Sequence, residues 1–557
     1  MFSLFAPTII DVRLIGSFSQ WKEILMNRQD DGTFICSPNI SDGQHEYKFR
    51  IKRKKEDDQW IDIIDPYVTK YDPEQNTGIM WVKEGKRLLN DAIEYKWKYD
   101  HTKMPENNNL IIYEIYVADF SDNEQFTGVI DRLDYLKDLG INAILLMPIV
   151  ESLGLSHDWG YVPRNFFSLK STFGTCTDLK NLVDQCHRRS IRILFDGVFN
   201  HTSGDCPLAI IDQDYWYYIG KHNPDDPYYW GPELNYEFYD KIRNIKPAVR
   251  YISDVVKYWI GEFHFDGLRF DAAKQMDNYD ILHELDQVAR NAARPGQPFT
   301  TQAEHMPETL NIIKANGGPT DTCWSLSFMN NIDEALADKF DLDKMKYIIG
   351  TPNLINYTAC HDNKRLLARL NERLSGFDDE IFRRMKLAAI ILTTSAGIPL
   401  IWQGDEIGDA ISVDETDENK TKIKRPMHWN LLKNKRNRNL FNTFKYLFAF
   451  RHKTDSLRNG EVDFCYENID DHVLVYRRGV NIIILCYFSN EKRINYTIEN
   501  ISTKANTIWI DILTNEYFIV NDRNTLVLTL NSYDGRILLQ TNKHNFRFCL
   551  PVPCFHD

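Results

Sequence analysis

The feature that most constrains the fold is a repeated change of period that begins near residue 108. Short apolar runs of strand length alternate there with longer amphipathic segments of helical period. Three of these pairs are "LIIYEIYV" with "GVIDRLDYLKDLG", "INAILLMP" with "DLKNLVDQCHRRS", and "FDGLRFD" with "NYDILHELDQVARNA". Strands that are each followed by a helix pair in parallel, because the chain must cross back over the sheet between them. This stretch is therefore predicted to be an α/β domain.

The number of such units predicts a closed (β/α)8 TIM barrel over residues 105–453. The later strands end in "FTTQAE", "LINYTAC" and "IPLIWQG", and the sixth strand, near 320–326, has the weakest pattern. An open doubly wound sheet is the alternative, but no G-x-G-x-x-G follows the first strand to favour it. Residues 202–245, after the third strand, form an aromatic segment without clear period, and a loop of this length is usually functional.

Short β-like runs occur on both sides of the barrel. Residues 1–90 contain several such runs between turn signals, which predicts a small immunoglobulin-like β-sandwich. Residues 455–557 show the same pattern and are predicted to form an antiparallel β domain. In the first domain, the basic run from Lys48 to Lys55 alternates like an edge strand with a solvated face.

Charge and composition exclude several classes of partner. The 557 residues carry a net charge of −13, whereas binding to nucleic acid or to an anionic membrane requires a concentrated basic surface. No window is apolar enough to span a membrane, and we find no secretion signal. The ten cysteines form no CxxC pair, and Cys186, Cys360 and Cys486 lie in apolar runs. Reduced thiols of this kind predict a cytoplasmic protein.

Acidic side chains stand at the ends of four predicted barrel strands. Histidine and arginine residues accompany them in the same short segments. The full set is Asp196, His201, Arg269, Asp271, Glu304, His361 and Asp362. Barrel enzymes place their chemistry at the C-terminal ends of the strands, so these side chains are expected to converge on one mouth of the barrel.

Arg269 stands two residues before Asp271, and alternation along a strand puts both side chains on the same side. We expect the guanidinium to lower the pKa of Asp271 and keep it ionised, while Glu304, in a more apolar setting, stays protonated. Two carboxyl groups with separated pKa values are what cleavage of a glycosidic bond needs. One attacks the anomeric carbon and the other protonates the leaving oxygen.

Taken together, short segments along the chain resemble a known family. The segments "DGVFNH" (196–201), "GLRFDAAKQ" (267–275), "AEH" (303–305) and "CHDN" (360–363) are similar, in order, to the four regions that define the α-amylase superfamily, glycoside hydrolase family 13. The N-terminal segments "LIGSFSQW", "DGQHEYKFRI" and "WIDIIDPY" resemble the carbohydrate-binding module that precedes the barrel in branching enzymes, debranching enzymes and trehalohydrolases.

The resemblance implies a role for each residue of the motifs. Asp271 would be the nucleophile, Glu304 the general acid/base, and Asp362 the carboxylate that positions the sugar and stabilises the transition state. The remaining roles fall on further residues of the same segments. Substrate would be bound by Tyr161, His201, Arg269 and His361, and the site would be supported by Asp196 and Asn200.

The family implies a retaining double displacement on an α-glucan or malto-oligosaccharide, with no redox or nucleotide cofactor. Hydrolysis is the favoured outcome, and a 1,4-α-glucan branching enzyme or a maltooligosyltrehalose trehalohydrolase is the alternative. Branching enzymes usually have a second Glu after the acid/base, where this chain has His305. An inactive glucan-binding scaffold is the alternative of another class, although none of the three carboxylates is missing. Calcium is possible near Asn200, but the long loop lacks a convincing spacing of oxygen ligands.

Overall fold

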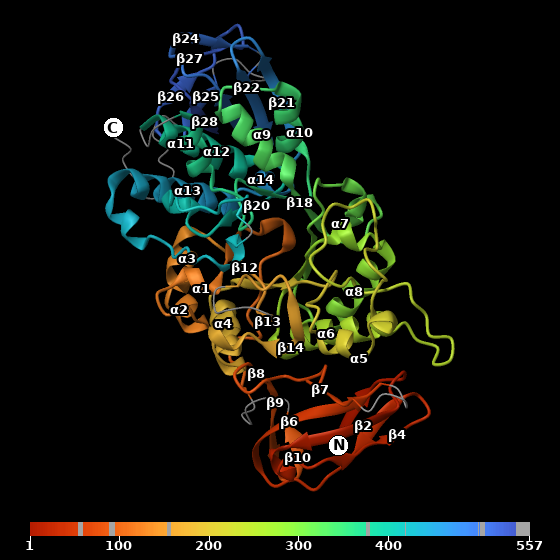
Figure 1. Ribbon diagram of the computed structural model, residues 1–557. Coiled ribbons are helices and arrows are strands. Elements are labelled where there is room, and N and C mark those ends of the chain that lie inside the picture. Colours follow the sequence, from red (N-terminus) through yellow and green to blue (C-terminus); the bar gives the residue numbers. More distant parts are fainter. Residues whose placement is uncertain are drawn as a thin grey trace.

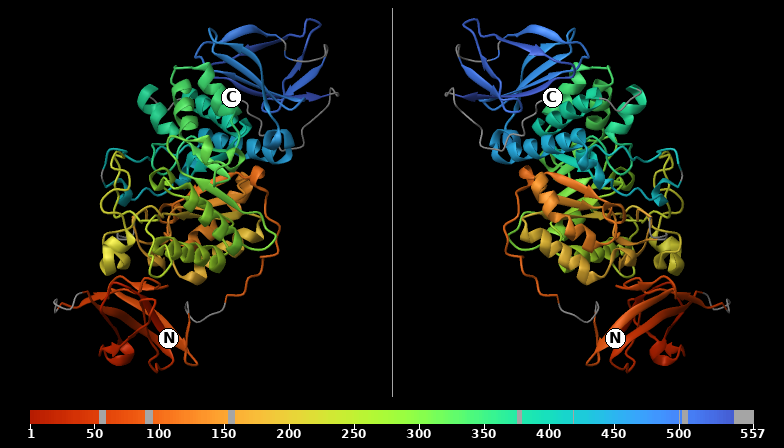
Figure 2. Two further views of the ribbon diagram at one scale, coloured as in Figure 1. Left: turned by 90° about the vertical axis from the view of Figure 1, so that its right-hand side faces the viewer. Right: turned by 90° about the vertical axis from the view of Figure 1, so that its left-hand side faces the viewer.

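The computed structural model describes residues 1–53, 59–88, 95–152, 158–374, 379–417, 419–499, 501 and 507–541. A β/α barrel forms the centre of the molecule, with an N-terminal β module at one end and a C-terminal β domain at the other (Figure 1). The two turned views in Figure 2 show the same order of the three parts. No helix within the described ranges combines the length and the apolar character needed to cross a membrane.

The barrel is closed by eight parallel strands, as predicted. The weak sixth strand is present as β18, and it pairs with both of its neighbours. In order around the barrel, the strands are β11 (Ile112–Ile115), β12 (Ala143–Leu146), β15 (Arg192–Gly197), β16 (Gly267–Phe270), β17 (Thr300–Ala303), β18 (Thr322–Ser325), β19 (Leu354–Tyr357) and β20 (Ile398–Trp402). Each strand is almost entirely buried, because side chains fill the barrel on one face and helices cover the other.

Helices surround these strands where amphipathic segments were predicted. Their apolar faces join the barrel side chains in one continuous hydrophobic cluster. The helices are α1 (Val117–Phe120), α2 (Phe126–Asp131), α3 (Leu133–Leu139), α4 (Cys176–Arg188), α6 (Pro247–Phe263), α7 (Ala273–Met276), α8 (Tyr279–Ala292), α9 (Leu326–Leu336), α10 (Leu342–Gly350), α11 (Leu366–Leu374), α12 (Asp379–Thr394), α13 (Lys435–Lys453) and α14 (Asp455–Asn459). A short hairpin of β13 (Val150–Ser152) and β14 (Pro163–Leu169) follows β12.

The N-terminal module contains two antiparallel sheets, as expected of a β-sandwich. One consists of β1 (Phe2–Phe5), β5 (Thr33–Cys36) and β4 (Asn27–Arg28). The other consists of β10 (Lys86–Leu88), β9 (Thr77–Lys83), β6 (Gly43–Lys52), β2 (Asp11–Gly16) and β3 (Ile24–Leu25), with β7 (Ile61–Ile63) on β6 and β8 (Tyr71–Asp72) on β9.

The basic run has the solvated face expected of it, but the strand that carries it is not at the edge of its sheet. Strand β6 lies inside the sheet, since it pairs with β2 along one side and with β9 and β7 along the other. Its alternation arises because Tyr47, Phe49 and Ile51 fill the core of the module, while the basic side chains between them face outward. The last two lysines of the run lie outside the described residues.

The long segment after β15 connects the barrel mouth to the module. It contains α5 (Pro207–Trp216), which Figure 1 shows between the barrel and the module. Ile211 of this helix is 2% exposed and belongs to the hydrophobic core of the module. Phe5 packs edge-on against Trp216, with ring centroids 6.2 Å apart, and Nε of Arg243 donates to the carbonyl of Asp31 at 2.9 Å. The module therefore supports this loop directly.

The C-terminal domain packs on the barrel through one face of a sheet. The six-stranded sheet contains β21 (Val462–Asn468), β22 (Val473–Arg478), β23 (Ile482–Tyr487), β28 (Gly535–Thr541), β25 (Ile508–Asp511) and β26 (Tyr517–Ile519), and a second sheet contains β24 (Arg493–Ile498) and β27 (Leu526–Leu530). Both faces of β23 are buried. Ile482, Ile484 and Cys486 join the barrel cluster, whereas Ile483 and Leu485 join the core of the domain itself.

Candidate active site

The predicted acids lie at one end of the barrel, each on a different strand. Asp196 is near the end of β15, Asp271 follows β16, Glu304 follows β17, and Asp362 lies in the loop beyond β19. Because all eight strands are parallel, their carboxyl ends share one rim. The side chains that the sequence analysis grouped are therefore held over the same opening.

One buried arginine holds three of these carboxylates. Nη1 of Arg269 lies 2.5 Å from Oδ1 of Asp196 and 3.1 Å from Oδ1 of Asp271, and Nη2 lies 3.0 Å from Oε2 of Glu304. The guanidinium also lies over the indole ring of Trp324, 4.6 Å from its centroid. Arg269 is fully buried, so these contacts are strong and fix the positions of the acids relative to one another.

The pKa expected for Asp271 is wrong. Burial and the neighbouring carboxyl of Glu304 raise the pKa of Asp271 well above its ordinary value, and Arg269 opposes them only in part. Burial also raises the pKa of Asp196, again against the effect of Arg269. The guanidinium thus offsets the burial of the two aspartates only in part, which favours their protonated forms in the free site.

A tight turn after β16 positions Glu304. The backbone N–H of Ala272 donates to Oε2 of Glu304 at 3.0 Å, and the N–H of Ala273 donates to the backbone carbonyl of Glu304 at 2.9 Å. Ala272 has φ of 49° and ψ of 38°, a left-handed conformation that costs an alanine about 1–2 kcal/mol. This strained turn directly follows Asp271, and it brings two backbone N–H groups to Glu304.

Asp362 belongs to a second ionic group, which it forms with His361 and Lys420. Its Oδ2 lies 3.4 Å from Nε2 of His361, and its Oδ1 lies 3.4 Å from Nζ of Lys420. Burial works to raise the pKa of Asp362, but His361 and Lys420 outweigh it and lower that pKa. Burial works to lower the pKa of His361, but Asp362 and Glu114 outweigh it and raise that pKa well above the usual value. Asp362 is thus ionised beside a protonated histidine.

Glu114, the other partner of His361, was not among the site residues predicted from the sequence. This residue of β11 is fully buried. Its Oε1 lies 2.7 Å from Nδ1 of His361, and its Oε2 accepts the backbone N–H of the same histidine at 3.3 Å. A carboxylate inside the apolar run "LIIYEIYV" was the available signal. It is the same kind of signal that identified Asp196 and Asp271.

The structure places Tyr161, His201 and Asn200 next to one another, with Tyr161 against His361. The hydroxyl of Tyr161 donates to Oδ2 of Asp196 at 3.0 Å, and its ring stacks on the imidazole of His361 with centroids 4.9 Å apart. Nε2 of His201 lies 2.7 Å from the carbonyl oxygen of Tyr161, and its Nδ1 lies 3.4 Å from Nδ2 of Asn200. Burial lowers the pKa of His201 to about 4, so the ring is neutral. Contact of these side chains with a sugar stays a prediction.

The long loop adds no support to the calcium ion considered near Asn200 from the sequence. Its first acid, Asp205, forms an ion pair with Arg164 at 3.0 Å, and the amide nitrogen of Asn200 faces His201. Across the part of the chain that the structure describes, no three histidine, cysteine or acidic side chains gather as a metal site. Calcium therefore stays a prediction that these residues do not support.

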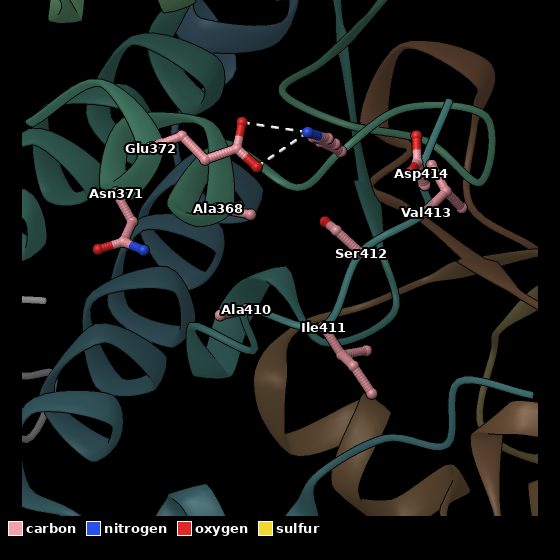
Figure 3. Close-up of a pocket in the computed structure, with 9 residues that line it drawn as sticks. Ala368, Asn371, Glu372, Ala410, Ile411, Ser412, Val413 and Asp414 are labelled. Atoms are coloured by element: carbon pink, nitrogen blue, oxygen red, sulfur yellow. Dashed lines mark hydrogen bonds and ion pairs between the residues drawn. The ribbon is translucent and has the colours of Figure 1, made fainter. Parts of the chain in front are cut away.

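A surface cavity of about 410 Å3 lies beside the mouth, between α11 and the segment after β20 (Figure 3). Nζ of Lys364 contacts both carboxylate oxygens of Glu372 across it, at 2.8 and 3.1 Å. Its lining residues are Lys364, Ala368, Asn371, Glu372, Ala410, Ile411, Ser412, Val413 and Asp414. This lining contains neither a ring on which a sugar could stack nor any of the carboxylates around Arg269. The chemistry therefore belongs to the Arg269 group and not to this cavity.

A closed β/α barrel with paired carboxyl groups at its mouth defines the class of barrel glycosidases. The family model described as "Alpha amylase, catalytic domain" matches residues 114–317 and 344–439, and the model described as "Carbohydrate-binding module 48 (Isoamylase N-terminal domain)" matches residues 1–68. The first match covers more than half of the chain. The chain belongs to the α-amylase family of glycoside hydrolases, so the class predicted from the sequence is confirmed.

The chain is similar to several characterised proteins over much of its length. It is 28% identical over 403 residues to a cyclomaltodextrinase of Thermoanaerobacter pseudethanolicus, covering 67% of this chain and 65% of that protein. It is 29% identical over 441 residues to neopullulanase 2 of Thermoactinomyces vulgaris, covering 74% of this chain and 70% of that one. A pullulanase type I from Bacillus subtilis, solved with maltose, shares the fold with a TM-score of 0.77 at 18% identity, covering 97% of this chain and 83% of that one.

Proposed function

We propose that this protein is a retaining hydrolase that cleaves α-glucosidic bonds in malto-oligosaccharides and related glucans. The observation that carries this proposal is the contact of one buried guanidinium with both Asp271 and Glu304. Carboxyl groups held this close suit a nucleophile and an acid acting on one bond, because the inverting reaction needs room for water between them. The names of the two relatives support the substrate class, since they point to cyclomaltodextrin and to pullulan.

In the first step, the sugar ring lies between the two acids. The step requires the proton of the pair on Glu304 and an ionised Asp271 beside Arg269. Asp271 attacks the anomeric carbon as the bond to the leaving oxygen breaks, and Glu304 transfers its proton to that oxygen. The ionised Asp362 stabilises the positive charge that develops on the sugar ring.

In the second step, the covalent ester between the sugar and Asp271 is hydrolysed. Glu304, now a carboxylate, takes a proton from water, and the water oxygen attacks the anomeric carbon. The bond to Asp271 breaks, which restores both side chains to their starting states. Two displacements on the same carbon retain the anomeric configuration.

The test is the configuration of the first product, together with the effect of Asp271→Asn. Maltotriose is incubated with the protein, and proton NMR records which anomer forms before mutarotation. We expect the α-anomer from the parent and a loss of at least about a thousandfold in kcat from Asp271→Asn. Asp280→Asn, at the exposed start of α8, is the matched control and should keep full activity. If the β-anomer appears first, the assignment of Asp271 as nucleophile is wrong.

Counting the reducing ends of the products distinguishes branching from hydrolysis. With amylose as substrate, hydrolysis raises the number of reducing ends, whereas branching lowers iodine staining with few new reducing ends. The residue after Glu304 is His305, whose Nδ1 lies 2.8 Å from the carbonyl oxygen of Pro307. No second carboxylate therefore directly follows the acid/base, which favours hydrolysis. A chain that binds amylose without ever changing it would support the scaffold alternative.

We also propose that the enzyme works in the cytoplasm. Its eight cysteines within the described ranges are all free thiols, and free buried thiols suit a reducing compartment. Burial raises the pKa of Cys186 and of Cys360 above the usual value, so neither is a reactive thiolate.

A further inference from the structure

His201 lies beyond the end of β15, so its backbone is held by other parts of the long loop. The segment 232–234 runs antiparallel beside it. His201 pairs with Glu233 in an isolated antiparallel bridge, and the N–H of Thr202 donates to the carbonyl of Pro232 at 3.0 Å. The position of His201 therefore depends on what holds this neighbouring segment in place.

A third segment, residues 216–218, lies along the other edge of the second one. Tyr217 pairs with Leu234 in another antiparallel bridge. The side chain of Tyr217 also reaches back to the first segment, because its hydroxyl lies 3.0 Å from Oγ1 of Thr202, the residue that follows His201. Both side chains are buried, where a hydrogen bond is strong and the loss of one partner is costly. Tyr217 thus fixes both neighbours of its strand-like group.

Tyr217 directly follows α5, the helix between the barrel and the module (Figure 1). One side chain of this helix, Ile211, belongs to the core of the module, whereas Tyr215 and Trp216 belong to the barrel cluster. Phe5 of the module packs against both of these rings, with centroids 6.2 Å away in each case. The contacts of α5 therefore run without a break from the module to Tyr217.

We propose that Tyr217 is a positioning residue for His201, and that the N-terminal module holds Tyr217 in place through α5. This inference rests on the proposed function, in which His201 contacts the sugar. A displacement of about 1 Å that starts far from the chemistry can cost about a hundredfold in rate. The module would then support catalysis without touching the substrate itself.

The first measurement reports the surroundings of His201 without any turnover. The protein is prepared with 13C-labelled histidine rings, and the NMR signals of His201 are assigned by their loss in His201→Gln. We expect these signals to shift or broaden in Tyr217→Phe, which removes only the hydroxyl, and in Ile211→Ala, which removes a contact of α5 with the module core. Circular dichroism confirms that each variant is folded, and Ile211→Val is the milder replacement should Ile211→Ala not fold.

Each variant has a matched control on the same loop. Tyr239→Phe removes a hydroxyl that contacts Asn244, and Ile219→Ala removes a side chain that is 88% exposed. Neither should move the signals of His201. Unchanged signals in Tyr217→Phe would overturn the role given to Tyr217, and unchanged signals in the variants of Ile211 would overturn the role given to the module.

The second measurement asks whether the variants act on catalysis through His201. The kcat for maltotriose is compared for Tyr217→Phe and Ile211→Ala, each alone and each combined with His201→Gln. We expect each single variant to lower kcat about tenfold and to cause little further loss once His201 is replaced, because residues that act through one another are not additive. Fully additive losses would contradict positioning, since the variants would then act by another route.

Failure of the inference and failure of the proposed function give different results. If the parent cleaves no maltotriose while Tyr217→Phe and Ile211→Ala both move the signals of His201, the proposed function is wrong but the module still positions this histidine. If the parent cleaves maltotriose and the signals do not move, the proposed function stands and the inference is wrong.

Discussion

At the scale of single residues, the site is controlled by how charge is shared around Arg269 and around His361. Arg269 holds three carboxylates but offsets the burial of Asp196 and Asp271 only in part. His361 lies between two carboxylates and is held protonated by them. The first group can store a proton for the leaving oxygen, whereas the second keeps a fixed negative charge for the sugar. Each group leads to a measurable expectation.

The first expectation concerns the acid limb of the pH profile. Only ionised Asp271 attacks, and its pKa lies well above 3.8, so activity should fall with pH before an ordinary aspartate would be protonated. Glu304→Gln removes a charge that raises this pKa. Fluoride needs little protonation to leave, so α-glucosyl fluoride can react in this variant without the acid. The burst of released fluoride should persist to lower pH in Glu304→Gln than in the parent. Stopped flow across about pH 4 to 8 measures this burst.

Glu308→Gln is the control for that experiment. Glu308 accepts hydrogen bonds from Ser325 and from the N–H of Ser327, so its replacement should leave the acid limb in place. A limb that moves to higher pH in Glu304→Gln would show that Glu304 does not raise the pKa of Asp271.

The second expectation concerns Glu114. Glu114→Ala leaves the protonated ring of His361 buried with one acid fewer, and breaking such a pair costs about 3 kcal/mol of unfolding free energy. Denaturant unfolding followed by tryptophan fluorescence measures this loss, and kcat/KM should fall with it because His361 also orients Asp362. Glu372→Ala removes a surface carboxylate paired with Lys364 and should cost about 0.5 kcal/mol. Equal losses in the two variants would contradict the role given to Glu114.

At the scale of elements, the strand ends were predictable and their surroundings were not. A charged residue at the end of an apolar run identified Asp196, Asp271 and the other rim acids, because the barrel places every such end on one rim. The position of β6 within its sheet could not be predicted. Alternation of apolar and polar residues shows that one face of a strand is buried, but it does not show which strands pair with it. The raised pKa of Asp271 depends on packing around three strands. Tyr217 lies in a loop without period, where no pattern applies.

The third expectation concerns α5. Ile211→Ala removes a side chain from the core of the module and should destabilise the contact between module and loop by about 2–4 kcal/mol. Hydrogen exchange should become faster for the amides of α5 while the barrel strands keep their protection. Ile219→Ala, on the same loop at 88% exposure, should change neither. Faster exchange throughout the barrel would mean that the loop is not a local unit.

At the scale of the whole molecule, the barrel and the C-terminal domain share one core. Helix α12 packs against β23 and β28, and the hydroxyls of Thr394 and Tyr476 lie 2.6 Å apart. A Cβ atom at Gly535 would lie 2.7 Å from Cδ1 of Ile390, so the sheet approaches the helix closely only because a glycine stands there. The sequence predicted both domains, but it gave no sign that the faces of β23 belong to different cores.

The fourth expectation follows from this shared core. The barrel and the C-terminal domain should melt in one calorimetric transition. Ile484→Ala, on the barrel side of β23, should lower the stability of that joint transition by about 2–4 kcal/mol without splitting it. Ile494→Ala, at 71% exposure on β24, is the control and should leave the transition unchanged. Separate melting of the C-terminal domain in Ile484→Ala would contradict a shared core.

The two ends of the molecule should therefore tolerate domain exchange very differently. A chimera with a foreign N-terminal module has to reproduce only the apolar contact surface for α5, the helix in the loop after β15. A chimera with a foreign C-terminal domain has to reproduce every second side chain of its central strands, in register with α12. Recombination between relatives should succeed far more often at the first junction than at the second.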